Sequence, residues 1–348
     1  MTEWRYIQTF TEQLARCGLQ PGEVVAVLSE SQSRQALVAT ARLAAQSLGG
    51  AVFDIVVPTP TSTHAVPIRS TGASRALEAN PAVVAALASS NLVIDCTVEG
   101  LLHAPELGSI LDGGARVLMI SNEHPDVFDR LTWDDDLPRR VGLGLGWLRE
   151  ANTMHVTSAA GTDLTIDLRG AVTAGSIGVT AGPGSIAHWP GGLVLAFPTA
   201  HSVNGMLVLA PGDVNLTFNR TLTSRIALTI TDDHITDISG DGVDAIHFRD
   251  YLASFGDREC YATSHVGWGM NPAARWEAFE LYDRRETWGT EARAVAGNFL
   301  YSTGANEHAG RFTAGHFDLP MRGCTVHLDD REVVRGGVLA SELAPRQP

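Results

Sequence analysis

The order of the apolar runs near the N-terminus constrains the fold more than any other feature of the chain. An apolar run over 23–28 is followed by an alanine-rich helical pattern over 31–48 and by a second apolar run over 51–57. Two parallel neighbouring strands need a crossover connection, and a helix is the usual one. This strand, helix and strand therefore predict a unit of a parallel α/β sheet.

The same alternation continues to about residue 150. The further helices are predicted over 4–17, 81–89 and 138–151, and the further strands over 91–98 and 116–120. We therefore expect residues 1–151 to form an α/β domain with a parallel sheet.

The composition changes after Asn152. Short runs rich in Thr, Val and Gly follow one another from 153 to 240 with turn residues between them, which is typical of antiparallel strands. Helices are predicted over 243–255 and 271–288. We expect residues 152–348 to form an α+β domain with a mostly antiparallel sheet, which carries the metal-binding catalytic site.

Composition excludes several classes of protein. The formal net charge of −14 argues against a nucleic-acid partner, because such proteins concentrate Lys and Arg on one face. No window approaches about 18 uncharged apolar residues, so no membrane span is expected. The four cysteines lie far apart without a metal or disulfide spacing, which suits a reducing cytoplasm. Gly142, Gly144 and Gly146 lack the spacing of a dinucleotide fingerprint and lie in a predicted helix, so no nicotinamide cofactor is predicted.

One short segment near the C-terminal end contains a chelating pair. In an extended segment His316 and Asp318 project to one face while Phe317 points to the other. His265 could add a second imidazole, and two imidazoles with one carboxylate suit iron(II), because they leave about three coordination positions for dioxygen and a substrate. The alternative is that the pattern arises by chance and that these residues only end strands.

Three further residues could act on a ligand. His103 follows the strand over 91–98, so it is expected at the carboxyl edge of the parallel sheet; it is either a general base or a histidine of a surface loop. His188 lies in a loop rich in Gly and Pro, which either holds a ligand or is only a hairpin connection. Ser302, near the polar end of an apolar strand, either contacts substrate or satisfies a turn.

Four segments together carry a resemblance to a known family. They are Ser264–Gly269, Gly297–Gly304, His316–Pro320 and the His188–Trp189–Pro190 loop. These segments closely resemble the 2,5-dihydroxypyridine 5,6-dioxygenases of bacterial nicotinate degradation, which share their fold with the M29 aminopeptidases. The resemblance covers nearly the whole chain in order and length, including the Leu102–His103 and Arg322–Cys324 neighbourhoods.

The resemblance implies a mononuclear Fe(2+) held by His265, His316 and Asp318. The substrates it implies are a hydroxylated pyridine and O2. The family reaction opens the pyridine ring, incorporates both oxygen atoms and gives N-formylmaleamate. The resemblance also implies a cytoplasmic homo-oligomer.

The resemblance also assigns roles around that iron. It implies that His103 is the base for a substrate hydroxyl and that Leu102, His188 and Ser302 contact the substrate. Ser176 stands where the family places a glutamate, which leaves open which heteroaromatic ring is the substrate. The alternative function is an M29-type metalloaminopeptidase, and the missing carboxylate argues against it, because a two-metal site needs extra carboxylates to hold the second cation.

Overall fold

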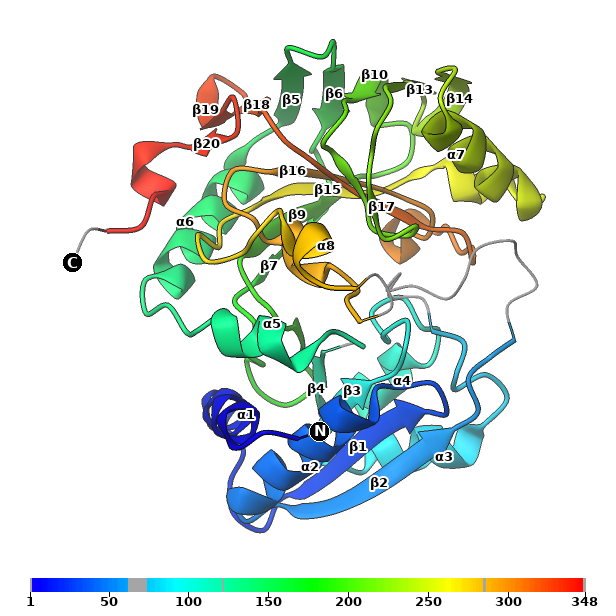
Figure 1. Ribbon diagram of the computed structural model, residues 1–348. Coiled ribbons are helices and arrows are strands. Elements are labelled where there is room, and N and C mark those ends of the chain that lie inside the picture. Colours follow the sequence, from blue (N-terminus) through cyan, green and yellow to red (C-terminus); the bar gives the residue numbers. More distant parts are fainter. Residues whose placement is uncertain (1, 62–73, 121, 284–285, 347–348) are drawn as a thin grey trace.

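The first layer of the molecule is a parallel sheet covered by helices. The computed structural model describes residues 2–61, 74–120, 122–283 and 286–346. The strands of this sheet run in the order β2-β1-β3-β4-β8, and the first four are β1 (Val24–Glu30), β2 (Ala51–Val57), β3 (Leu92–Cys96) and β4 (Arg116–Met119). The parallel α/β architecture predicted for the N-terminal part is confirmed (Figure 1).

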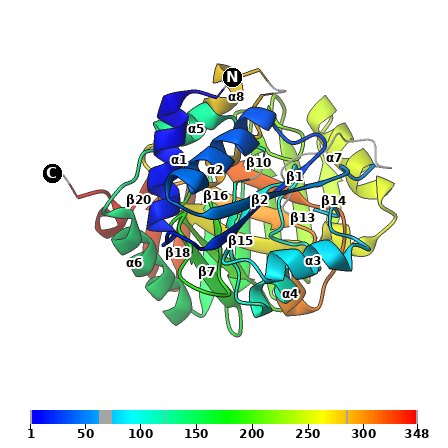
Figure 2. The same cartoon turned by 90° about the horizontal axis from the view of Figure 1, so that it is seen from below.

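Alternate residues of β1 pack against helices on opposite faces. Val25 and Val27 pack with α1 (Trp4–Arg16) and α2 (Gln35–Ser47). Ala26 and Leu28 pack with residues of α3 (Pro81–Ala88) and α4 (Leu107–Asp112). Figure 2 shows these two helix pairs on opposite sides of β1 and β2. Both faces are buried, which explains the continuous apolar run from Val24 to Leu28.

The last strand of this sheet comes from much later in the chain. β8 (Ile186–His188) pairs with β4 in parallel, so the chain returns to the first layer after residue 152. A division at 151/152 therefore does not separate the two layers. His188 belongs to the edge of the parallel sheet and not to a hairpin connection.

The second layer contains two large antiparallel sheets and a two-stranded one formed by β11 (Val214–Asn215) and β12 (Arg220–Thr221). The larger has the order β14-β13-β10-β6-β5-β18-β19-β20, with β5 (Thr153–Ser158), β6 (Asp163–Asp167), β10 (Val203–Leu209), β13 (Ile226–Thr231), β14 (His234–Ser239), β18 (Cys324–Leu328), β19 (Arg331–Arg335) and β20 (Val338–Leu339). The smaller has the order β17-β16-β15-β9-β7, with β7 (Val172–Ser176), β9 (Leu193–Phe197), β15 (Thr263–Gly269), β16 (Phe299–Thr303) and β17 (Phe317–Met321). The α+β domain with a mostly antiparallel sheet is confirmed.

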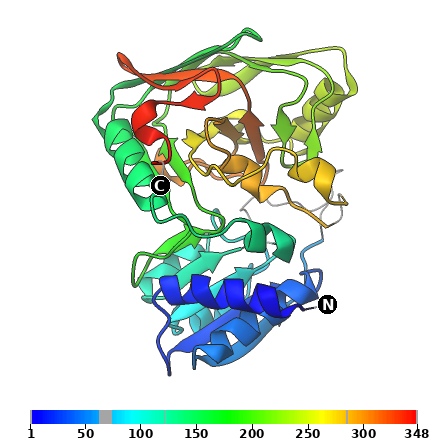
Figure 3. The ribbon, with the colours of Figure 1, turned by 60° about the vertical axis from the view of Figure 1, so that its left-hand side comes forward.

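The smaller sheet lies in the middle of the molecule. One of its faces shares a hydrophobic core with the larger sheet, to which Val194, Trp268 and Phe299 contribute from one side and Leu164 and Leu228 from the other. In Figures 1 and 3 the parallel sheet lies below it. The strands β15, β16 and β17 therefore lie where the two layers meet. α6 (Leu137–Glu150) and α7 (Val243–Ser254) flank the second layer, close to their predicted bounds.

The helix predicted over 271–288 is wrong. Its described residues contain only α8 (Ala278–Leu281), while Asn271 forms a bridge to Val295 instead of starting a helix. The backbone N–H of Trp288 donates to the buried carboxylate of Glu123 in the first layer. These contacts with distant residues hold the segment in an irregular course.

Two short helices were not predicted from the pattern, α4 and α5 (Pro125–Arg130). Each has six residues, which is too short for a helical period to be recognised. Throughout the described ranges, the structure contains no helix with the length and apolarity needed to cross a membrane.

Candidate active site

The predicted metal ligands come from two strands of the smaller antiparallel sheet. His316 immediately precedes β17, Asp318 lies within it, and both side chains are buried. Phe317, between them, points to the opposite face, where its ring stacks on Phe248 with 4.2 Å between the ring centroids. The predicted alternation is confirmed, and it leaves an imidazole and a carboxylate on one face.

His265 reaches the same point from β15. The pairing of β15 with β16 shifts its register between Thr263 and Val266, and such a bulge re-aims the side chains within it. The Nε2 atoms of His265 and His316 lie 3.5 Å and 3.3 Å from the same atom, Oδ1 of Asp318. The three side chains therefore converge.

The donor atoms fit a single metal ion by type and spacing. Two donor atoms at right angles around a metal, each about 2.1 Å from it, lie about 3 Å apart. Within the described ranges, however, no group of three or more His, Cys, Asp or Glu side chains is closed around a metal-sized point. The hydroxyl of Ser302 lies among the donors instead, 2.9 Å from Nε2 of His265 and hydrogen-bonded to Oδ1 of Asp318. A metal ion bound here would replace these hydrogen bonds.

The two imidazoles are in the protonation state that metal ligation needs. The hydroxyl of Ser264 donates to the carbonyl of Ala305 and lies 3.1 Å from Nδ1 of His265. The Ser302 hydroxyl stands in the same relation to Nε2, because it donates to Asp318. A metal ion on Nε2 would replace that contact, and Nδ1 would then carry the imidazole proton and donate it to Ser264. Burial lowers the pKa of His265 to about 4 and also lowers the pKa of His316, so both rings are neutral at pH 7.

Arg293, to which no sequence pattern pointed, completes the centre. It ends η2 (Thr290–Arg293), and its Nε and Nη2 atoms both lie 2.6 Å from Oδ2 of Asp318. Burial opposes ionisation of Asp318, but Arg293 and the neighbouring imidazoles outweigh it and hold the pKa of this carboxyl well below its ordinary value. Because Oδ2 is bound to Arg293, the carboxylate offers only Oδ1 towards the imidazoles.

A cavity of about 140 Å³ lies against these side chains. Both layers contribute to its wall: Leu102 and His103 follow β3, His188 lies in β8, and Ser176 ends β7. The remaining wall is mostly apolar and includes Met119, Ile186, Leu193, Leu195, Phe197 and Leu300. The structure therefore brings Leu102, His103 and His188 together with the ligands.

Ser302 is placed differently from the expectation. It is not among the described residues that line the cavity, and its hydroxyl contacts His265 and Asp318. Its contact is therefore with the predicted metal ligands and not with the cavity.

His103 faces the ligands across the cavity. Its ring centroid lies 5.3 Å from that of His316 and 6.0 Å from that of His265. The loop that carries it is held by Asp95 at the end of β3, whose buried carboxylate accepts a hydrogen bond from the N–H of Leu101. The side chain of His103 is only 3% exposed, so it is not a surface-loop histidine. Neither ring nitrogen has a hydrogen-bond partner among the described residues.

His188 presents one nitrogen to the cavity. Its Nδ1 lies 3.2 Å from the carbonyl oxygen of Pro190 and donates to it. Burial lowers the pKa of His188 to about 3, so the ring is neutral and Nε2 is an acceptor. The neighbouring Trp189 packs against Phe10 and Phe128 in the core of the first layer and does not reach the site.

Comparison with known proteins shows the family of the chain. A family model described as NicX: 2,5-dihydroxypyridine 5,6-dioxygenase matches residues 5–341. The chain belongs to this family. A protein of Pseudomonas putida KT2440 named 2,5-dihydroxypyridine 5,6-dioxygenase is 38% identical over 340 residues, 96% of either chain.

Two solved structures share the fold of this member of the dioxygenase family. That of 2,5-dihydroxypyridine dioxygenase from Pseudomonas putida KT2440 superimposes with a TM-score of 0.89 at 36% identity and covers 97% of each chain. That of wild-type AmpT from Thermus thermophilus has a TM-score of 0.62 at 14% identity and covers 97% of this chain and 99% of the other. The second likeness supports the fold alone.

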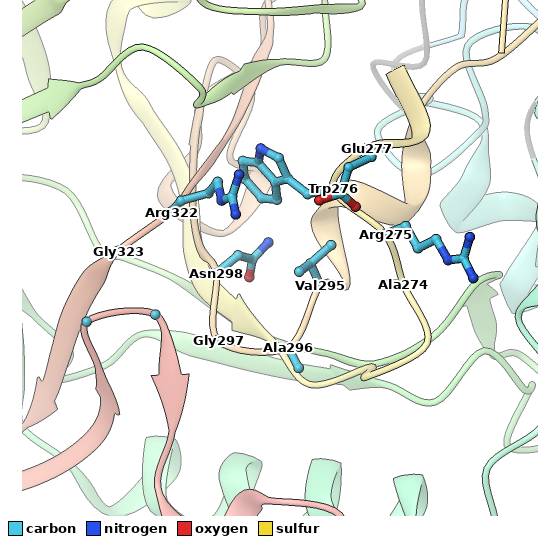
Figure 4. A pocket seen from close by; sticks show the side chains of 12 residues that line it. Ala274, Arg275, Trp276, Glu277, Val295, Ala296, Gly297, Asn298, Arg322 and Gly323 are labelled. Carbon is cyan, nitrogen blue, oxygen red and sulfur yellow. The ribbon is translucent and has the colours of Figure 1, made fainter. Parts of the chain in front are cut away.

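A larger cavity of about 520 Å³ lies elsewhere in this family member (Figure 4). Its wall contains Trp276, Arg322 and several glycines, and the Arg322 guanidinium lies 5.5 Å from the centroid of the Trp276 ring. Asn298 also lines it, but its amide bonds to the backbone of Gly269 and Ala292. No predicted site residue lies among the described residues of this wall, so the smaller cavity is the candidate active site.

Three residues in or beside the candidate site were not predicted from the sequence. Arg293 lies in a run without periodicity or motif, and only its ion pair with Asp318 reveals it. Ser264 directly precedes a predicted ligand, and a hydroxyl beside a ligating histidine is a recognisable signal. Glu307 lies next to His103 and directly follows the polar turn that ends β16.

Proposed function

We propose that this chain is an iron(II)-dependent dioxygenase that opens the ring of a hydroxylated pyridine such as 2,5-dihydroxypyridine, with N-formylmaleamate as the product. The observation that carries the proposal is the convergence of His265 and His316 on one oxygen of Asp318 at the wall of a buried cavity. The name of the relative that is 38% identical over nearly the whole chain supports the substrate.

The chain's own residues would divide the work in a simple way. His265 and His316 give neutral imidazole nitrogens and Asp318 gives one carboxylate oxygen, a donor set that leaves about three positions on iron(II). Bound iron supplies the redox chemistry with dioxygen and holds both reactants together. His103 accepts the proton of the ring hydroxyl of a substrate bound in the cavity. The apolar wall keeps water away from this imidazole.

The cavity suits one small ring. Apolar cavities of about 150 Å³ bind benzene, and this one has a volume of about 140 Å³. Leu102 and the apolar wall contact the ring faces, while His188 offers an acceptor nitrogen to a ring N–H or hydroxyl. Ser176 lines the same cavity without a charge, so its neighbourhood is where a different substituent on the ring would be accommodated.

The M29-type aminopeptidase alternative is less consistent with the site. A two-metal centre needs bridging carboxylates, and the second oxygen of Asp318 already binds the guanidinium of Arg293 at 2.6 Å. A second dication on that side would face a fixed positive charge.

A homo-oligomeric state and a cytoplasmic location stay predictions, for which sizing of the purified protein and fractionation of the cells are the tests.

The decisive experiment is anaerobic reconstitution with iron(II), followed by a metal count per chain and oxygen uptake with 2,5-dihydroxypyridine. We expect one iron per chain, uptake that requires iron, loss of the aromatic absorbance, and both atoms of labelled dioxygen in the product. Zinc-loaded protein is the matched control and should take up no oxygen. One tightly bound iron without uptake would contradict this substrate, whereas two zinc or cobalt ions with peptide hydrolysis would support the aminopeptidase.

A further inference from the structure

Glu307 is the only acidic side chain found within ion-pair distance of His103 in the described chain. Its Oε1 atom lies 3.4 Å from Nδ1 of His103. Glu307 begins η3 (Glu307–Ala309), which follows β16, so it comes from the second layer, whereas His103 comes from a loop of the first. The contact therefore joins the candidate base to the layer that carries the metal ligands.

The turn that carries Glu307 is itself well held. The side chain of Asn306 accepts a hydrogen bond from the N–H of Ala309 and donates one to the carbonyl of Pro198. Asn306 is fully buried, while the side chain of Glu307 is 36% exposed and that of His103 is 3% exposed. The buried imidazole of His103 therefore lies beside the carboxylate of Glu307 at the edge of the site. The hydrogen bonds of Asn306 hold the backbone that carries this carboxylate.

The charge of Glu307 agrees with this contact. Burial works to raise the pKa of Glu307, but the interaction with His103 outweighs it, so the pKa lies below its ordinary value and the carboxylate is ionised at pH 7. A carboxylate can only accept a hydrogen bond. The tautomer of His103 with the proton on Nδ1 satisfies it and leaves the lone pair on Nε2.

We propose that Glu307 is a positioning residue that holds His103 in the orientation and tautomer of a base. The two side chains face each other at 3.4 Å without a hydrogen bond in this structure, and in the working site Nδ1–H would donate to Glu307. Nε2 would then be left to accept the proton of a substrate hydroxyl in the cavity. The hydroxyl oxygen keeps the electron pair, and the imidazolium formed is balanced by the carboxylate. The inference rests on the proposed function and adds to it a residue outside the cavity wall.

Kinetics of two variants test this role. Glu307→Ala should lower kcat by about 10- to 100-fold, a part of the 10²–10⁴ that a positioned base contributes, with KM and iron per chain within about 2-fold of wild type. Glu307→Gln should lose less, because its amide oxygen still accepts the Nδ1 proton. Glu332→Gln is the matched control, because Glu332 contacts His327 at 3.6 Å far from the cavity, and it should change nothing.

A double-mutant cycle separates positioning from a structural role. In a His103→Ala background, Glu307→Ala should cause no further loss of kcat, because it acts only through His103. Losses that multiply would overturn the inference. Equal kcat of Glu307→Ala and wild type would overturn it as well.

A second readout does not depend on turnover. In zinc-loaded protein with isotope-labelled histidine, NMR of the ring nitrogens should show His103 protonated on Nδ1 in wild type and a shift of that proton to Nε2 in Glu307→Ala. The same tautomer in both proteins would contradict the inference. Wild-type protein that cleaves no ring would overturn the proposed function alone, since the tautomer would still be measured.

Discussion

The two sides of the candidate active site are built in different ways. The ligand side lies within one sheet: His265 and Asp318 are on β15 and β17, with β16 paired between them. The base side comes from the first layer, where His103 follows β3 and His188 lies in β8. Strand register positions the ligands, whereas the base side depends on contacts between layers. Under the proposed function, damage to the first side should therefore release the iron, and damage to the second should slow the reaction.

Buried contacts of Glu123 help to fix the layers to one another near the site. The carboxylate of Glu123 accepts hydrogen bonds from the N–H groups of Trp288 and Thr290 and from the hydroxyls of Thr287 and Thr290. These residues lead directly into η2 and Arg293. One carboxylate in the first layer thus orders the segment that delivers Arg293 to the ligands.

The largest effect is expected at the ligand side. Asp318→Asn should reduce iron per chain by about 10-fold or more and turnover by about 10³-fold or more, because the anionic ligand is lost. Metal analysis and oxygen uptake measure both. The matched control is Asp233→Asn, which alters another buried aspartate paired with an arginine, Arg311, and should keep its iron. Full iron content in Asp318→Asn would contradict the ligand assignment.

The base side should respond in kcat alone. His103→Ala should keep its iron and lower kcat by about 10²- to 10⁴-fold, because the general base is removed while the three ligands stay in place. Metal content and steady-state kinetics of the same preparation decide it. His155→Ala, an exposed histidine paired with Asp163, should behave as wild type. Loss of iron from His103→Ala would contradict the assignment of metal binding to the ligand side alone.

The contact between the layers should show an intermediate effect. Glu123→Ala leaves several buried donors without an acceptor, so we expect the free energy of unfolding to fall by about 3 kcal/mol or more. We also expect kcat to fall by about 10-fold, because Arg293 and His103 are no longer held in register. Chemical denaturation and kinetics at a temperature where the variant is folded measure both. Unchanged kcat would show that the layers stay aligned without Glu123.

The last prediction concerns only the free energy of unfolding and its dependence on pH. Burial raises the pKa of Asp95 from 3.8 to about 6, so the folded state binds this proton more tightly than the unfolded state does. The free energy of unfolding should therefore gain a term on the order of 3 kcal/mol as the pH falls from above 6 to below 4, and lose it as the pH rises again. Unfolding curves of wild type and Asp95→Asn between these pH values should differ in slope with this sign. Parallel pH profiles would contradict it.

Much of the first layer and part of the site follow from local patterns. Apolar runs and helical periods located β1, α2 and β2 closely, because the strands of a parallel sheet covered by helices are mostly apolar. The two-residue period of a strand was enough to place His316 and Asp318 on one face. In the region 271–288 the helical signal failed, because the backbone there bonds to partners far away in the chain.

The amino-acid sequence by itself determined the layer types, the pair formed by His316 and Asp318, and the position of His103 after a parallel strand. Only the tertiary structure decided that β8 returns to the first sheet and that a bulge turns His265 towards His316 and Asp318. It also decided that Arg293 contacts Asp318 and that Glu307 lies beside His103. The reason is physical. Periodicity reports the environment of neighbouring residues, whereas an ion pair or a bulge depends on residues far away in the chain, whose approach no local pattern contains.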